Sequence, residues 1–214
     1  MVGPENKHQL SPRQRERVEN FNSLREGLLA KGFAEKILTV SMLKANLMVF
    51  VTTLPAVLVL YGLYIIVNGV ERRSYGGSGF LFILALLLGI VLHELIHGAV
   101  WAVYCKNKWQ SVHFGVNWAT LTPYCHCAEA LSIPKYAIGC AMPTILLGFL
   151  PYLFGLAFNH LPIAHFGLLF ILAGGGDAYI LWLIRKEKHS LILDHPYLVG
   201  CIVFYPNRQA CVEQ

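Results

Sequence analysis

Four long apolar segments restrict the folds that this sequence can adopt. They cover approximately residues 43–69, 79–104, 137–158 and 163–184. Each has the roughly 20 residues that an α-helix needs to cross about 30 Å of hydrocarbon. Only 14% of the residues are charged, whereas about a quarter are charged in an average soluble domain. The sequence therefore predicts an all-α membrane protein with four transmembrane helices.

Polar segments on either side of these runs divide the chain into three parts. Residues 1–42 form a predicted cytoplasmic, amphipathic N-terminal segment, residues 43–184 the four-span membrane core, and residues 185–214 a cytoplasmic C-terminal tail. Only residues 159–162 separate the last two spans, and so short a connection requires an antiparallel pair of helices. At this length we expect one domain.

The distribution of Lys and Arg predicts the orientation in the membrane. With the N-terminus inside, the cytoplasmic segments carry eight basic residues up to Lys44, three in 105–136 and four after residue 184, whereas the outer loops carry only Arg72 and Arg73. Basic residues accumulate on the cytoplasmic side of membrane proteins. We therefore expect both termini in the cytoplasm and the lipid bilayer as a partner. No basic stripe interleaved with aromatic residues is present, so no nucleic-acid partner is expected.

The N-terminal segment contains a predicted helix that begins at Ser11-Pro12, a cap followed by a proline suited to the first turn. It is expected to end at Gly32. An apolar stripe runs along this helix. Such a stripe is typical of a helix on the anionic inner leaflet, and packing against the rest of the protein explains it equally well. The stripe consists of Val18, Phe21, Leu24, Leu28 and Leu29.

Short strands are predicted outside the four spans. Residues 37–41 are a candidate strand, and the tail contains two more near residues 190–193 and 198–205. Residues 112–118 alternate between apolar and polar types, which is the period of a strand. Strand backbone at membrane depth must be covered by protein or line a wet cavity. We therefore expect residues 112–118 to be a re-entrant, β-like segment that dips toward a cavity.

The second span contains the motif HELIHG, residues 93–98. Positions four apart lie on one face of a helix, so His93 and His97 can bind one zinc ion. Glu94 can then act on a water molecule whose pKa the zinc lowers to about 7. Ionisable groups inside a membrane span are costly and rarely lack a function. The motif therefore predicts a zinc site with Glu94 as catalytic base.

Asp177 is the candidate third ligand, since a catalytic zinc ion usually has three protein ligands and one open position. Of the twelve acidic residues, only Glu94 and Asp177 lie within a predicted span. His93 lies 14 residues after Gly79, and Asp177 lies 14 residues after Ile163. Both spans run inward, so both residues should lie approximately 21 Å from the outer surface. The preceding Gly174-Gly175-Gly176 lets helices approach closely.

A competing cluster is Cys125-His126-Cys127, followed by Glu129. Thiolate and imidazole ligands favour zinc or copper, but this spacing matches none of the common structural zinc patterns. Reduced cysteines in a cytoplasmic loop are the simpler interpretation, and the other cysteines also face the reducing side. The Asp194-His195-Pro196 sequence is interpreted as a turn from which His195 could also reach the metal. The histidines interpreted as solvated or interfacial are His113, His160, His165 and His189.

With HELIHG and the later GGGD, the chain resembles the site-2 protease class of intramembrane metalloproteases. It is more similar to a zincin peptidase family of small bacterial membrane proteins, over about residues 35–205. The resemblance includes TVSMLKA, CAEALSIPKYAIGCAMP and DHPYLVG. It implies a bacterial cell membrane, His93, His97 and Asp177 as zinc ligands, and Glu94 as base. Site-2 proteases usually have Asp-Gly at the third ligand, whereas Ala178 follows Asp177 here.

The expected function is hydrolysis of peptide bonds in a membrane protein or peptide at the cytoplasmic side of the bilayer. Residues 112–118 could pair with an extended substrate by edge addition. Two alternatives remain open at this point. One is a catalytically silent zinc-binding scaffold or adaptor. The other is a metal transporter, which four spans with a single central site and no internal repeat make the weaker alternative.

Overall fold

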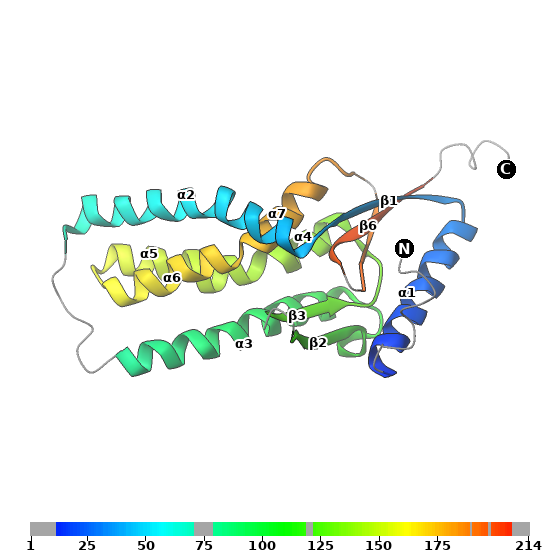
Figure 1. Cartoon of the computed structure of the whole chain (residues 1–214), viewed down its shortest axis with the longest axis horizontal. Helices are drawn as coiled ribbons and strands as arrows, with labels where there is room; N and C mark the ends of the chain where they lie inside the picture. The colour runs from blue at the N-terminus through cyan, green and yellow to red at the C-terminus, as the bar shows by residue number, and fades with distance from the viewer. Residues whose placement is uncertain (1–11, 71–78, 119–121, 189, 197, 207–214) are drawn as a thin grey trace.

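The computed structural model describes residues 12–70, 79–118, 122–188, 190–196 and 198–206. The molecule is elongated and mostly helical, with the long helices toward one end and the strands at the other (Figure 1). The helical elements are α1 (Pro12–Ala30), α2 (Met42–Asn68), α3 (Gly79–Tyr104), the short η3 (Lys108–Ser111), α4 (Ile133–Pro143), the π-helical η4 (Thr144–Phe149), α5 (Leu150–Ala157), α6 (Leu161–Ala173) and α7 (Gly175–Ile184). The strands are β1 (Phe33–Val40), β2 (Val112–Asn117), β3 (Thr122–Cys127), β4 (Leu131–Ser132), β5 (Leu191–Asp194) and β6 (Val199–Pro206).

The predicted apolar runs form the long helices. α2 and α3 follow the first two predicted spans closely, and α4, η4 and α5 together form the third candidate span, Ile133–Ala157. The fourth predicted span is two helices, because α6 and α7 are bent by 44° at their junction. Three successive glycines lie there, and glycine is a poor helix former. Within the part of the chain that the structure describes, three helices are thus long and apolar enough to cross a membrane, and the bent pair is a fourth candidate.

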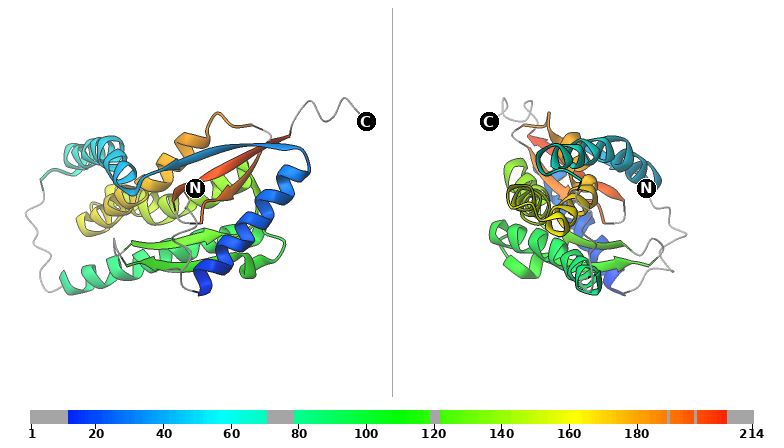
Figure 2. Two further views of the ribbon diagram at one scale, coloured as in Figure 1. Left: turned by 45° about the vertical axis from the view of Figure 1, so that its right-hand side comes forward. Right: turned by 90° about the vertical axis from the view of Figure 1, so that its left-hand side faces the viewer.

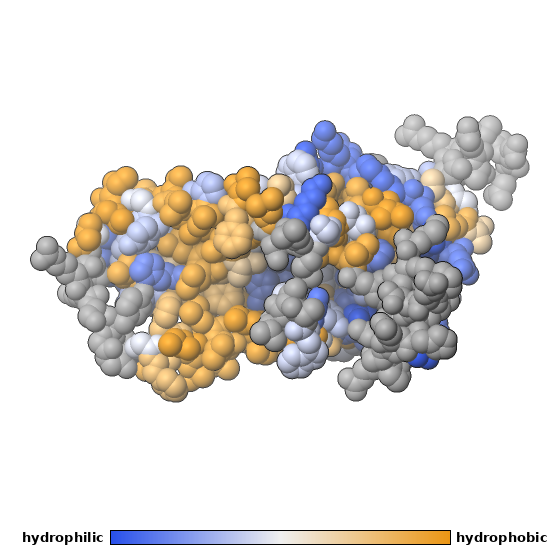
Figure 3. Space-filling view, viewed as in Figure 1, coloured by the Kyte–Doolittle hydropathy of each residue, from blue (hydrophilic) through white to orange (hydrophobic). Residues whose placement is uncertain are grey.

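The helical end exposes an unusual amount of apolar surface. Ile66 on α2 is 82% exposed and Phe80 on α3 is 74% exposed. Orange, hydrophobic side chains cover most of this end in Figure 3, whereas the blue, hydrophilic residues gather over the strands. A soluble monomer rarely exposes so large an apolar patch. This surface is the one expected of helices in contact with lipid, and it indicates a membrane protein.

A four-stranded sheet joins the two ends of the described chain. Its order is β1-β6-β5-β4, and β1 pairs antiparallel with β6 along its whole length, from Phe33 opposite Pro206 to Val40 opposite Val199. β5 and β6 lie near the predicted tail strands, and β1 begins earlier than the predicted strand 37–41. Helices dominate as predicted, and β1, β5 and β6 correspond to the three short strands predicted at the two ends of the membrane core. The sequence did not predict β4 or the pairing of these strands into one sheet.

α1 packs against one face of the four-stranded sheet (Figure 2). Phe21 is buried against Leu193, Ile202 and Phe204, and Leu24 and Leu28 lie at the border of this cluster. Of the two interpretations of its apolar stripe, packing against the protein is therefore the one that the fold adopts. The helix ends as predicted near Gly32, which has a φ of 78°. The predicted cap Ser11 lies outside the described residues.

A β-hairpin lies beside the second half of α3. β2 corresponds to the predicted strand 112–118 and pairs antiparallel with β3, a strand that the sequence did not predict. Gly98 on α3 allows the contact, because a Cβ there would lie 2.4 Å from the ring of Phe114 and 2.9 Å from Val112. The hairpin therefore packs directly on the helix that carries the HELIHG motif.

Candidate metal centre

Three side chains from two helices converge in one cluster. His93 and His97 lie one turn apart on α3, and Asp177 lies in the first turn of α7. His93 Nε2 is 3.2 Å from Asp177 Oδ2 and 3.2 Å from His97 Nε2, and His97 Nε2 is 3.3 Å from Asp177 Oδ2. Both histidines are buried. The three side chains predicted to be zinc ligands thus lie together in one cluster.

The spacing of these three atoms fits a zinc ion. Zinc binds histidine nitrogen at 2.0–2.1 Å, and three corners of a tetrahedron with such bonds lie roughly 3.3 Å apart. The separations in this cluster are 3.2 to 3.3 Å. Two nitrogens and one carboxylate oxygen with the fourth position left open are a donor set typical of catalytic zinc. Among the residues that the structure describes, this is the one group of His, Cys, Asp or Glu side chains close enough to hold a metal ion.

The hydrogen bond on the other side of His97 explains why the cluster needs a cation. His97 Nδ1 lies 2.9 Å from the backbone oxygen of Gly139. A carbonyl oxygen can only accept a hydrogen bond, so the imidazole proton of His97 is on Nδ1. In a neutral imidazole, Nε2 then has no proton and presents a lone pair. That lone pair faces the carboxylate oxygen of Asp177. Two acceptors at this distance require a proton or a metal ion between them.

Glycine at two places permits the approach of the helices. A Cβ on Gly139 would lie 1.9 Å from the indole nitrogen of Trp101, so only glycine lets α4 present its carbonyl to His97. Within the GGGD sequence, a Cβ on Gly174 would lie 1.9 Å from Thr144 Oγ1, and one on Gly175 would lie 2.6 Å from Thr53 Oγ1. These contacts set the first turn of α7, and with it Asp177, against α2 and η4.

Glu94 is held beside the metal ligands by a strand. It is half-buried on α3, directly after His93. Its carboxylate accepts a hydrogen bond from the backbone N–H of Cys125 in β3. A carboxylate fixed next to a candidate zinc site is in the position required of a general base.

The cluster Cys125-His126-Cys127 forms no second metal site among the described residues. The Sγ atom of Cys127 lies 3.5 Å from that of Cys105 at the end of α3. His126 is buried, and burial lowers its pKa to about 3 although the Asp194 carboxylate is 3.7 Å away. The described cysteines are free thiols, as predicted.

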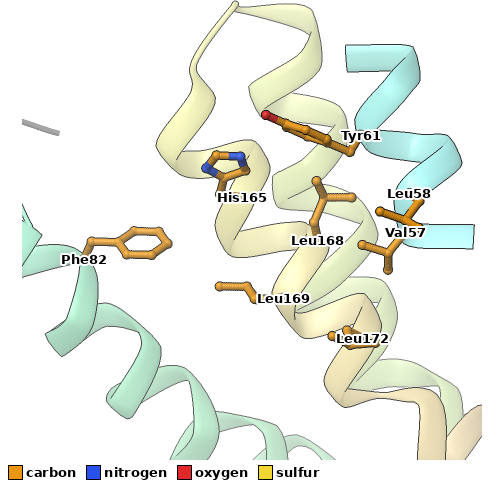
Figure 4. Close-up of a pocket in the computed structure, with 8 residues that line it drawn as sticks. All are labelled: Val57, Leu58, Tyr61, Phe82, His165, Leu168, Leu169 and Leu172. Carbon is orange, nitrogen blue, oxygen red and sulfur yellow. The ribbon is translucent and has the colours of Figure 1, made fainter. Parts of the chain in front are cut away.

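The remaining described histidines do not join the metal cluster. His113 and His160 are exposed, as predicted, and His189 lies outside the described residues. His165 is different, since it lines an open apolar cavity of about 360 Å³ between α2, α3 and α6, opposite Phe82 and beside Tyr61 (Figure 4). His195 packs on the ring of Phe21, and its Nδ1 accepts from the backbone N–H of Leu198.

Sequence reasoning missed one carboxylate near the site. Asp194, interpreted as a turn residue, is the buried last residue of β5. It accepts hydrogen bonds from the hydroxyl of Tyr136 and from the backbone N–H of Cys127, the latter at 2.9 Å. Burial raises its pKa to about 6 against the effect of these two donors. The available sequence signal was that Asp194 lies two residues after the apolar Ile192, so both side chains would lie on one face of a strand.

Comparison with known proteins gives one match. A family model described as "Putative zincin peptidase" matches residues 86–192, half of the chain, and this part includes the HELIHG motif and Asp177. No curated protein and no solved structure matches the chain. Zincins are metallopeptidases with the H-E-x-x-H pattern on a helix, so membership indicates a zinc-dependent peptidase. Because the family model matches half of the chain and the matched part contains the converging side chains of His93, His97 and Asp177, this chain belongs to the zincin peptidase family.

Proposed function

We propose that this protein is an intramembrane zinc metalloprotease that hydrolyses peptide bonds of a membrane protein on the cytoplasmic side of the bilayer. The observation that carries this proposal is the triangle of His93, His97 and Asp177 beside the carboxylate of Glu94, on helices with lipid-type surfaces. A relation to site-2 proteases agrees with such a site but rests on the sequence resemblance alone.

In this mechanism the protein positions the groups that move protons. Zinc, when bound, acts as a Lewis acid and makes water a nucleophile at neutral pH. His93, His97 and Asp177 would hold it, and the Gly139 carbonyl keeps the Nε2 lone pair of His97 directed inward. Glu94 takes the proton of the attacking water and later delivers it to the leaving amine. The hydrogen bond from β3 keeps Glu94 in place for both transfers.

The hairpin beside α3 is the candidate site for an extended substrate. The outward N–H groups of β3 already have acceptors, since Cys125 donates to Glu94 and Cys127 to Asp194. β2, within the predicted segment 112–118, pairs with the opposite edge of β3. The other edge of β2 pairs with no strand among the described residues. We therefore propose that a substrate strand adds to this edge of β2.

We also propose that the chain crosses the membrane four times, with α6 and α7 together as the last crossing. β1 precedes the first long helix, and β6 follows the last. Because these two strands pair along their whole length, they lie on one side, and the number of crossings between them must be even. A reporter that is active only in the cytoplasm should therefore work at either end of the chain. Activity at one end alone would contradict an even number.

The proposed function is tested with purified protein reconstituted in lipid vesicles. The substrate is a membrane-spanning peptide with a helix-breaking Gly-Pro near its cytoplasmic end, and products are identified by mass spectrometry. We expect cleavage by the zinc-loaded protein, loss of cleavage after zinc is removed with a chelator, and recovery when zinc is returned. Magnesium should not restore it, because Mg²⁺ prefers octahedral oxygen ligands.

The same preparation distinguishes the alternatives. A zinc-binding scaffold would lose thermal stability when zinc is removed but would show no cleavage with zinc present. A transporter would move zinc into the vesicle lumen. Cleavage that continues unchanged in the metal-free protein would contradict the proposal.

A further inference from the structure

We propose that Asp194 is a positioning residue for this site and that it holds both the ligand His97 and the base Glu94 from a distance. The inference rests on the proposed function. Asp194 touches none of the three candidate ligands, and it lies beyond residue 192, where the match to the family ends. Its two hydrogen bonds lead to the site by two separate routes.

The first route runs through α4. The hydroxyl of Tyr136 donates to Asp194 Oδ1, and the backbone oxygen of Tyr136 accepts the indole N–H of Trp101 at 3.2 Å. The indole stacks on the Tyr136 ring at 5.3 Å and on the His97 ring at 5.2 Å, measured between ring centroids. One turn further along α4, Gly139 accepts the Nδ1 proton of His97. Asp194 therefore fixes the part of α4 that orients this ligand.

The second route runs through β3. Asp194 Oδ2 accepts the backbone N–H of Cys127, and Glu94 accepts the backbone N–H of Cys125. Residues two apart in a strand present their N–H groups on the same edge. The two carboxylates thus hold one edge of β3 from adjacent positions. If the Asp194 contact is lost, this edge can shift relative to the base.

The environment of Asp194 suits this role. It is 8% exposed, and its core neighbours include Ile192 and Cys201, which are fully buried. With a pKa of about 6, the carboxylate is mostly ionised at pH 7, when it can only accept hydrogen bonds. Two donors from different elements satisfy it. A buried carboxylate with no metal or base function of its own is costly, and its two hydrogen bonds both lead toward the candidate site.

The test uses three variants of the full chain in detergent, each examined for zinc affinity, kcat and thermal unfolding. Asp194→Asn replaces one acceptor oxygen with an NH₂ group, so one of the two donors loses its partner. Loss of a residue that orients a metal ligand typically costs about 10–100-fold in metal affinity or activity. We expect Asp194→Asn to raise the zinc Kd by about 10-fold or more and to lower kcat at saturating zinc. Tyr136→Phe interrupts only the first route, so it should raise the zinc Kd and lower kcat by less than Asp194→Asn does.

The matched control is Leu193→Ala, in the adjacent residue of β5. Its side chain points to the opposite face of the sheet and packs with Phe21. Removing it should lower the unfolding temperature without changing zinc Kd or kcat. If Asp194→Asn folds poorly, Tyr136→Phe still tests the first route, since it removes a single hydroxyl.

Zinc affinity, measured by competition with a chromogenic chelator, separates this inference from the proposed function. If the wild-type protein binds zinc but cleaves nothing, the peptidase proposal fails while the zinc Kd of the variants still tests the role of Asp194. If Asp194→Asn or Tyr136→Phe changes the zinc Kd or kcat and Leu193→Ala does not, the result supports the route that the variant interrupts. The inference would be overturned if Asp194→Asn had the same zinc Kd and kcat as the Leu193→Ala control and differed from the wild type only in a lower unfolding temperature.

Discussion

Replacement of Glu94 by glutamine is expected to lower kcat for peptide hydrolysis by about 10²–10⁴-fold, the usual contribution of a general acid–base. Glutamine cannot take a proton from water, but its side-chain oxygen can still accept the backbone N–H of Cys125. The position of β3 should therefore be kept, and the variant should still bind one zinc ion. Single-turnover cleavage and metal content measured on the same sample check both expectations.

Glu26→Gln is the control for this change. Glu26 lies on the exposed face of α1, so loss of its charge should leave cleavage unaffected. A Glu94→Gln protein that cleaves at the wild-type rate would show that Glu94 is not the base. A variant that loses zinc would show instead that Glu94 contributes to the metal site.

Replacement of Asp177 by alanine is expected to weaken zinc binding by more than about 100-fold, because loss of a residue that only supports a ligand already costs 10–100-fold. The change removes the only oxygen donor of the triangle and leaves two histidine nitrogens. Cleavage should disappear at zinc concentrations that load the wild-type protein but leave the purified variant without metal. Metal analysis after dialysis, with chelator competition for the Kd, measures the effect.

His165→Ala is the control for this change. It tests whether replacing a polar side chain elsewhere in the helical bundle also weakens zinc binding. His165 lies in α6 and lines the apolar cavity rather than the metal cluster. Its replacement should leave one zinc ion bound with wild-type affinity. Equal zinc loss in both variants would indicate a general disturbance of the bundle, and full zinc retention by Asp177→Ala would remove Asp177 from the ligand set.

Local sequence patterns were sufficient to predict the helices and the residues of the cluster. The apolar runs correspond to α2 and α3 almost to the residue, because a helix in lipid must be both long and apolar. The closeness of Asp177 to His93 was predictable for a similar reason, since a constant rise per residue converts a position along a helix into a height. The His93 and Asp177 side chains do meet, with Nε2 and Oδ2 3.2 Å apart.

The contacts around the cluster could not be predicted in this way, because they depend on segments far apart in the chain. The bend between α6 and α7 depends on how closely Gly174 can approach Thr144. The partner of Glu94 comes from β3, whose sequence contains a proline and no clear alternation. Asp194 reads as a turn residue until β5 pairs with β6 and buries it. Tertiary packing decided each of these positions.

The pairing of β1 with β6 has a consequence for the order of assembly during synthesis. β1 is made before every apolar helix, and its partner is made after all of them. Contacts between such distant segments form late, since the whole intervening chain must first be arranged. β5, which carries Asp194, is also among the last elements to be made. A nascent chain thus makes the HELIHG helix and the β2–β3 hairpin beside it well before β5 and β6. The hydrogen bonds of Asp194 therefore form only after all three residues of the metal cluster have been synthesised.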